Sequence, residues 1–104
     1  MHEVILFHKL RMSAFIKNYL NDGDLDNSLQ QIEQMSQERT DFLNEFIEPY
    51  EELQKLNLMN VAQAYGIMTG ANLYPPTVEG GLVFVNHLYS ELKEIAQKYR
   101  TTQE

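Results

Sequence analysis

Apolar residues recur at intervals of three and four along most of this 104-residue sequence, and this spacing restricts the fold more than any other feature. A side chain returns to the same face of an α-helix after three or four positions, whereas strand residues alternate with a period of two. In residues 3–20, Ile5, Met12, Ile16 and Tyr19 lie near one helical face. The run VILF could form a short strand, but no partner strand is evident. We therefore expect an all-α fold.

The second helical segment is the longest, and we expect residues 28–57 to form one helix. Asn27 followed by Gln30 has the spacing of a capping box, which predicts the start of this helix. Its apolar stripe consists of Leu29, Ile32, Met35, Phe42, Leu43, Phe46, Ile47, Tyr50 and Leu53. Pro49 lies inside the stripe, where it removes a backbone hydrogen bond and clashes with the preceding turn. The helix should therefore kink near Pro49 or restart there.

Two further helices complete the expected architecture. Asn60 has the same capping spacing and predicts a short helix over 61–69, with Gly70 ending it in a left-handed cap. Thr77 follows two prolines and can cap a last helix that runs to about residue 99. We predict a single domain over residues 1–104, built as a small four-helix bundle with a long second helix kinked near Pro49. Four amphipathic stripes in so short a chain also allow a homodimer.

Composition excludes several classes of site and location. The chain has no cysteine, which excludes disulfides, thiolate zinc sites and cysteine nucleophiles. The N-terminal apolar run is interrupted by His8, Lys9 and Arg11, which a signal peptide does not tolerate. No stretch has the length of apolar sequence that a membrane span requires. We expect a cytoplasmic protein that does not bind membranes.

The net charge of −7 is concentrated in the middle of the chain. Residues 22–52 contain ten acidic residues and a single base, Arg39. Such a segment repels phosphates, so direct binding to nucleic acid is not expected. It attracts a protein partner with a basic surface.

Five acidic residues in this segment follow steps of 3, 4, 3 and 4, which places them along one side of a continuous helix. They are Glu38, Asp41, Glu45, Glu48 and Glu52. Like charges at these spacings weaken a helix by about 0.2–0.5 kcal/mol per pair, and the helix itself supplies few cations. The column can be a solvated face that keeps the protein soluble, or a docking surface for a cationic partner. The second alternative predicts a non-enzymatic interaction module with an inhibitory or regulatory role.

A second hypothesis is a calcium-binding module with an EF-hand-like loop at residues 22–33. Asp22, Asp24, Asp26 and Glu33 match four ligand positions of such a loop. Against this, the sixth position carries Asn27 in place of the usual glycine, and no second acidic loop exists to pair with it. The same acids also suit a polar turn before a helix, where the helix dipole favours negative charge.

Catalytic residue patterns are absent from the sequence. The serines lie on expected helices without the strand-to-helix turn of a nucleophile elbow. Neither His8 nor His87 is preceded three positions earlier by glutamate, as carboxylate-bridged metal sites in helical bundles require. We expect no enzyme activity and no cofactor; the alternative hypothesis adds Ca²⁺ at the loop described above.

Overall fold

The computed structural model describes residues 2–20 and 24–103, and it describes only the backbone of residues 2 and 101–103. In these ranges the chain is all-helical, which confirms the expected class. The elements are α1 (His2–Tyr19), α2 (Leu25–Ser36), the short 3-10 helix η1 (Asp41–Leu43), α3 (Asn44–Lys55), α4 (Val61–Gly70) and α5 (Val78–Gln103). The described residues therefore form five α-helices, one more than we expected.

The additional helix arises because the long second helix is two helices, so the prediction of one helix over residues 28–57 was wrong. The chain leaves the helix after Ser36 and re-enters it through η1. The buried Ser36 hydroxyl donates to the carbonyl of Ile32 at 2.8 Å, a bond that tends to bend a helix. No apolar residue lies between Met35 and Phe42, and only the small polar side chains of Ser36 and Thr40 are buried in this stretch.

Pro49 lies within α3 and does not mark the break. Its side chain is buried among the core residues. The amide hydrogen bond that proline lacks would reach back to Glu45, in the first turn of α3. The helix nevertheless continues through Pro49 to Lys55.

Two of the predicted helix starts are confirmed. The Asn60 side chain accepts from the amide of Gln63 at 3.0 Å, and Thr77 Oγ1 accepts from the amide of Gly80 at 3.0 Å. The start of α2 differs from the prediction, because Asp24 and not Asn27 is the capping residue. The Asp24 carboxylate accepts from the amide of Asn27 at 3.2 Å.

The left-handed caps are formed by asparagines. Asn57 follows α3 with φ 58° and Asn72 follows α4 with φ 63°. The amide of Leu73 then donates to the carbonyl of Met68 at 2.9 Å, which satisfies one of the last carbonyls of α4. Our prediction that Gly70 forms this cap was wrong, because Gly70 is the last residue of α4 itself.

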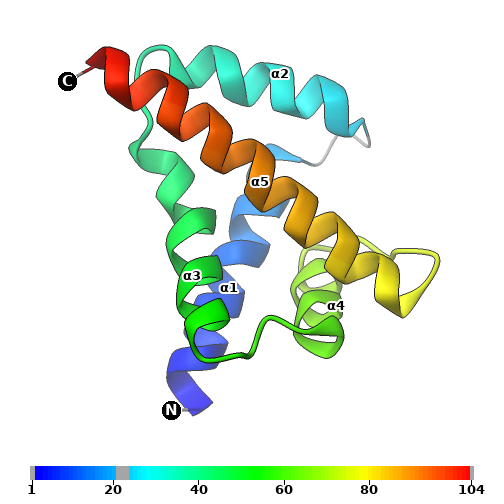
Figure 1. Ribbon diagram of the computed structural model, residues 1–104. Coiled ribbons are helices and arrows are strands. Elements are labelled where there is room, and N and C mark those ends of the chain that lie inside the picture. The colour runs from blue at the N-terminus through cyan, green and yellow to red at the C-terminus, as the bar shows by residue number, and fades with distance from the viewer. Residues whose placement is uncertain (1, 21–23, 104) are drawn as a thin grey trace.

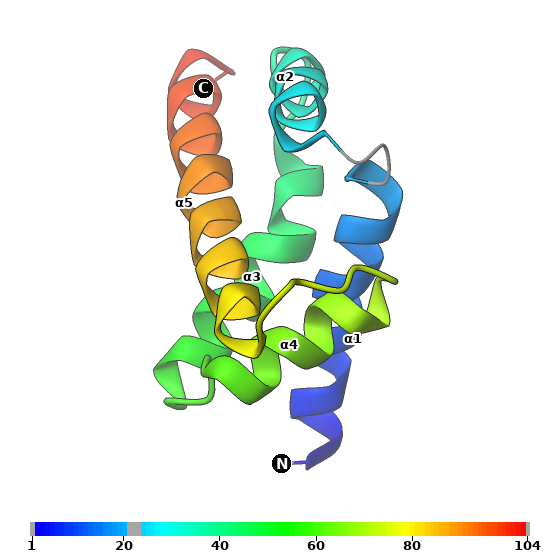
Figure 2. The same ribbon diagram turned by 90° about the vertical axis from the view of Figure 1, so that its right-hand side faces the viewer.

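The helices pack around one apolar core. Helix α1 packs against α3 and α4, α4 packs against α5, and α2 contacts the other helices chiefly through α5 (Figure 1). The view turned by 90° shows α2 and the C-terminal half of α5 side by side at one end of the molecule (Figure 2). The largest fully buried side chains include Phe15, Phe46, Leu53, Ile67 and Leu88. Among the described residues, no helix combines the length and apolar character needed to cross a bilayer.

Candidate functional site

The five acidic residues predicted to form one column are divided between different elements. Glu45, Glu48 and Glu52 lie exposed on α3, as the spacing requires. Glu38 lies in the turn after α2, and Asp41 is the first residue of η1. The five side chains are exposed, but the expectation that one continuous helix aligns them was wrong.

Two cations, one on α1 and one at the end of α3, lie close to the α3 carboxylates. Arg11 of α1 lies 3.4 Å from Glu45 and 3.3 Å from Glu48, and it also donates to the backbone carbonyl of Asn44. Lys55 lies 3.3 Å from Glu52. Arg11, which lies on another helix, therefore relieves much of the repulsion between the α3 carboxylates.

Asp41 has a partner of its own. Arg39 donates two hydrogen bonds to the Asp41 carboxylate, at 2.9 and 2.7 Å. The hydrogen bond from Arg39 lowers the pKa of Asp41, and the same bond raises the pKa of Arg39. Among the five predicted residues, Glu38 alone has no cation within 4 Å in the described part of the chain.

A different acidic surface forms where α2 lies beside α5. A hollow of about 320 Å³ separates the two helices and is lined by Asp26, Leu29, Gln30, Glu33, Glu91 and Ile95. An adjoining hollow of about 150 Å³ shares three of these residues and adds Glu94 and Lys98. We call the two together the α2–α5 groove. Ile95 is buried and Leu29 is partly buried, so the groove has an apolar floor between polar walls.

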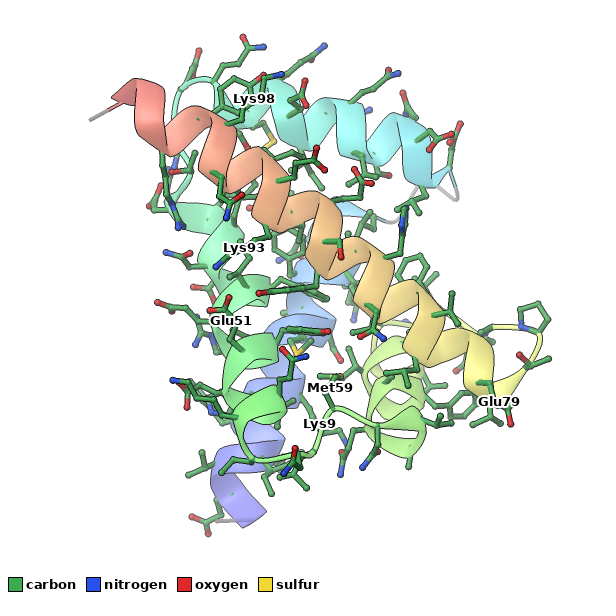
Figure 3. All side chains as sticks on the ribbon, viewed as in Figure 1. Lys9, Glu51, Met59, Glu79, Lys93 and Lys98 are labelled. Carbon is green, nitrogen blue, oxygen red and sulfur yellow. The ribbon has the colours of Figure 1, made fainter. Side chains whose placement is uncertain are left out.

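The walls of the α2–α5 groove carry four carboxylates, from Asp26, Glu33, Glu91 and Glu94. Among the described residues one lysine, Lys98, lines it (Figure 3). The Lys98 ammonium lies 3.9 Å from Glu33, at the outer limit of an ion pair. His87 lies 4.0 Å from Glu91 and contributes charge only when it is protonated. The groove therefore combines excess negative charge with a concave, partly apolar surface.

Glu91 and Glu94 were not among the predicted site residues, because the acidic residues of the chain are concentrated in residues 22–52. A signal for them exists in the sequence. Glu91 and Glu94 are three positions apart, and Asp26 and Glu33 are seven apart, so each pair lies on one side of its helix. The spacing does not predict that α2 packs beside α5. This packing brings the two pairs to one groove.

The residues of the calcium hypothesis are placed only in part, because Asp22 lies outside the described residues. Helix α2 already begins at Leu25, so Asp26 and Glu33 are helical positions, separated by about 10 Å of axial rise. Within residues 2–20 and 24–103, no group of three or more potential ligands is gathered closely enough for a metal ion. Calcium binding stays a prediction, for which a rise of the melting temperature with added calcium is the measurement.

A cluster of titratable groups links α3 to α5. Glu51 Oε2 accepts from Tyr89 at 2.6 Å and from Lys93 at 2.8 Å (Figure 3). The Tyr89 ring stacks on Tyr50 with centroids 3.9 Å apart, and Tyr50 donates to Asn86. The hydrogen bonds from Lys93 and Tyr89 lower the pKa of Glu51. Burial, followed by the hydrogen bond to Glu51, raises the pKa of Tyr89 to about 12.

These bonds hold the Glu51 cluster in one geometry and direct its polar atoms toward each other. Each carboxylate and hydroxyl bond joins α3 to α5. A phenol whose pKa is raised in this way stays protonated at neutral pH, which makes it a hydrogen-bond donor and not a base. The cluster therefore serves to fix the packing of the two helices.

Comparison of the chain with models of known protein families, with characterised proteins and with solved structures returned no match.

Proposed function

We propose that this protein is a non-enzymatic interaction module that holds a basic, amphipathic segment of a partner protein in the α2–α5 groove. One observation carries the proposal: among the described residues, the two hollows of the α2–α5 groove together are lined by four carboxylates and one lysine, over an apolar floor. Lysine and arginine side chains of a partner would lie against the walls, and its apolar side chains would cover Leu29 and Ile95. Filling or releasing the groove in this way suits a regulatory role.

The five predicted carboxylates form the second candidate surface for the same kind of partner. We call this surface the α3 face, although Glu38 and Asp41 precede α3 and only Glu45, Glu48 and Glu52 lie on it. It is less favourable because Arg11, Arg39 and Lys55 already occupy much of its negative charge. A partner would have to displace these pairs, and exposed ion pairs of this kind are worth about 0–1 kcal/mol each. The two surfaces can be separated by experiment.

The test compares two quadruple variants with the same change of charge. The groove variant is Asp26→Asn with Glu33→Gln, Glu91→Gln and Glu94→Gln. The control variant on the α3 face is Asp41→Asn with Glu38→Gln, Glu45→Gln and Glu52→Gln. Each removes one aspartate and three glutamates and leaves side chains of nearly the same shape.

The probe is a fluorescein-labelled peptide in which leucines recur every three or four residues and lysines fill the other positions, so that a helix has one apolar and one basic face. Binding is followed by fluorescence anisotropy. A peptide of the same composition in scrambled order reports attraction by net charge alone. We expect the groove variant to weaken binding of the ordered peptide by about tenfold or more, which corresponds to 1.4 kcal/mol. The control variant should weaken it less than about threefold, as expected for exposed charges. Equal losses in both variants, or no preference for the ordered peptide, would overturn the proposal.

A further inference from the structure

The first half of α1 exposes four large apolar side chains on the outside of the molecule. Val4 and Leu6 are each 50% exposed, and Phe7 and Leu10 are each 59% exposed. In both ribbon views the first turns of α1 extend past the ends of α3 and α4 (Figures 1 and 2). No described element covers this face, whereas monomeric proteins rarely leave such residues clustered.

The exposed face continues along the helix with the spacing of a helix–helix seam. Glu3, Phe7, Leu10, Ala14 and Lys17 follow steps of 4, 3, 4 and 3, and all five are exposed. Steps of three and four are typical of helices that pack against another helix along their length. The opposite face of α1 is already used, since it is buried against the core. Helix α1 therefore has apolar residues on two faces, one of which packs inside this chain.

The exposed seam is self-complementary. Where two α1 helices cross antiparallel about a twofold axis near Leu10, residues whose numbers sum to 20 lie at the same height. Leu10 then meets Leu10 of the second copy, and Leu6 lies level with the small Ala14 of that copy. Glu3 lies level with Lys17 of the second copy, and neither residue has an ion-pair partner within 4 Å in the described part of this chain. A twofold interface requires this kind of correspondence, in which residue i meets j and j meets i.

The charge distribution favours the same face. The chain carries a net charge of −7, so two copies repel each other over most of their surfaces. Helix α1 contains one acidic residue, Glu3, against the three basic residues Lys9, Arg11 and Lys17. Two copies that meet through α1 keep their acidic helices apart. We propose that this protein forms a homodimer in which the two α1 helices pack antiparallel through Phe7, Leu10 and their neighbours.

The length of the seam sets how tightly the copies can associate. Helix α1 has 18 residues, which is about 27 Å of helix. A specific interface typically buries about 800 Å² on each partner, and one helix face lies at the low end of that range. We therefore expect a reversible dimer whose population rises with protein concentration.

Sedimentation velocity over a range of concentrations tests the proposal. The wild-type protein should shift from the 12.2 kDa of one chain toward twice that mass. Leu10→Glu should raise the dissociation constant by about tenfold or more, because the two introduced carboxylates would face each other near the axis. Val83→Glu is the matched control, since Val83 is 68% exposed on α5 and the change adds the same charge. The control should dimerise like the wild type, apart from the small effect of the added charge.

A charge exchange tests the antiparallel geometry separately. Glu3→Lys alone and Lys17→Glu alone should each weaken the dimer, and the double variant should restore it. Glu3 and Lys17 also interact favourably with the dipole of their own helix. If that were their only role, the double variant would have the least stable α1 of all the variants, and its dimer would not recover. Circular dichroism of each variant shows whether α1 remains folded. A wild-type protein that stays at 12.2 kDa at all concentrations, or a double variant that does not recover, would overturn the proposal.

Discussion

Two hydrogen bonds to Glu51, from residues far away in the sequence, hold α3 and α5 together. Glu51 is on α3, while Tyr89 and Lys93 are one turn apart on α5. The carboxylate accepts from both, and the ring of Tyr89 stacks on that of Tyr50, also on α3. Burial and this bond favour the neutral phenol, which places the pKa of Tyr89 at about 12, above its ordinary 10.0.

The raised pKa gives Tyr89 a specific effect on stability at alkaline pH. Because the folded-state pKa lies above the unfolded one, the contribution of Tyr89 is fully present below pH 10 and is lost as pH rises toward 12. Tyr89→Phe should lower the free energy of unfolding by about 1 kcal/mol at neutral pH. The difference between the variant and the wild type should shrink between pH 10 and 12, as measured by urea unfolding at several pH values.

Tyr74→Phe supplies the control, since the Tyr74 side chain is 70% exposed in the loop before α5. This variant should leave the free energy of unfolding unchanged within about 0.5 kcal/mol. A Tyr89→Phe effect that stays constant over the whole alkaline range would contradict the link to ionisation.

At the scale of elements, the contact between α1 and α4 depends on a glycine. A Cβ atom added at Gly70 would lie 2.8 Å from Ser13 Oγ and 3.5 Å from Ser13 Cβ. The Ser13 hydroxyl is held in place because it donates to the carbonyl of Ile67 at 2.7 Å. Gly70 is therefore required for close packing against α1, which explains a glycine inside the last turn of α4.

This contact predicts that Gly70→Ala destabilises the wild-type protein but stabilises a protein in which Ser13 is already alanine. Gly70→Ala alone should destabilise the protein by about 1 kcal/mol. The steric clash between the new Cβ and Ser13 Oγ outweighs the higher helix propensity of alanine. In a Ser13→Ala background the nearest atom becomes Cβ at an ordinary distance. There Gly70→Ala should stabilise the protein by a few tenths to about 1 kcal/mol. The cycle is measured by thermal or urea unfolding, and equal effects in both backgrounds would show that Ser13 moves away freely.

At the scale of the whole molecule, packing redistributes the negative charge of the chain. On the α3 face, cations lie close to most of the carboxylates, while the α2–α5 groove brings four carboxylates near one lysine. Repulsion between charges that are not paired destabilises the compact state and is screened by salt. The location of the excess charge should therefore affect how the free energy of unfolding depends on salt, even when no partner is present.

Salt dependence of unfolding provides that measurement. The free energy of unfolding of the wild-type protein should rise from low salt to about 0.15 M, where the Debye length falls to about 8 Å. The groove variant should show a smaller rise, by about 0.2–0.5 kcal/mol for each like-charge contact removed. The α3 variant should keep the wild-type rise or exceed it, because it removes attractive as well as repulsive pairs. The opposite order would place the excess charge on α3.

Local spacing was sufficient to predict the helical class, the caps at Asn60 and Thr77, and the short helix α4, because each depends on residues within a few positions of one another. The break after Ser36 also had a local signal, the polar stretch between Met35 and Phe42, but the apolar residues on either side concealed it. The charged surface required the packed molecule. Arg11 reaches Glu45 across 34 positions, and Glu91 joins Glu33 only because α2 lies along α5. Electrostatic interactions depend on the distance between charges in space. The helical periodicity of one segment does not predict its distance from another segment.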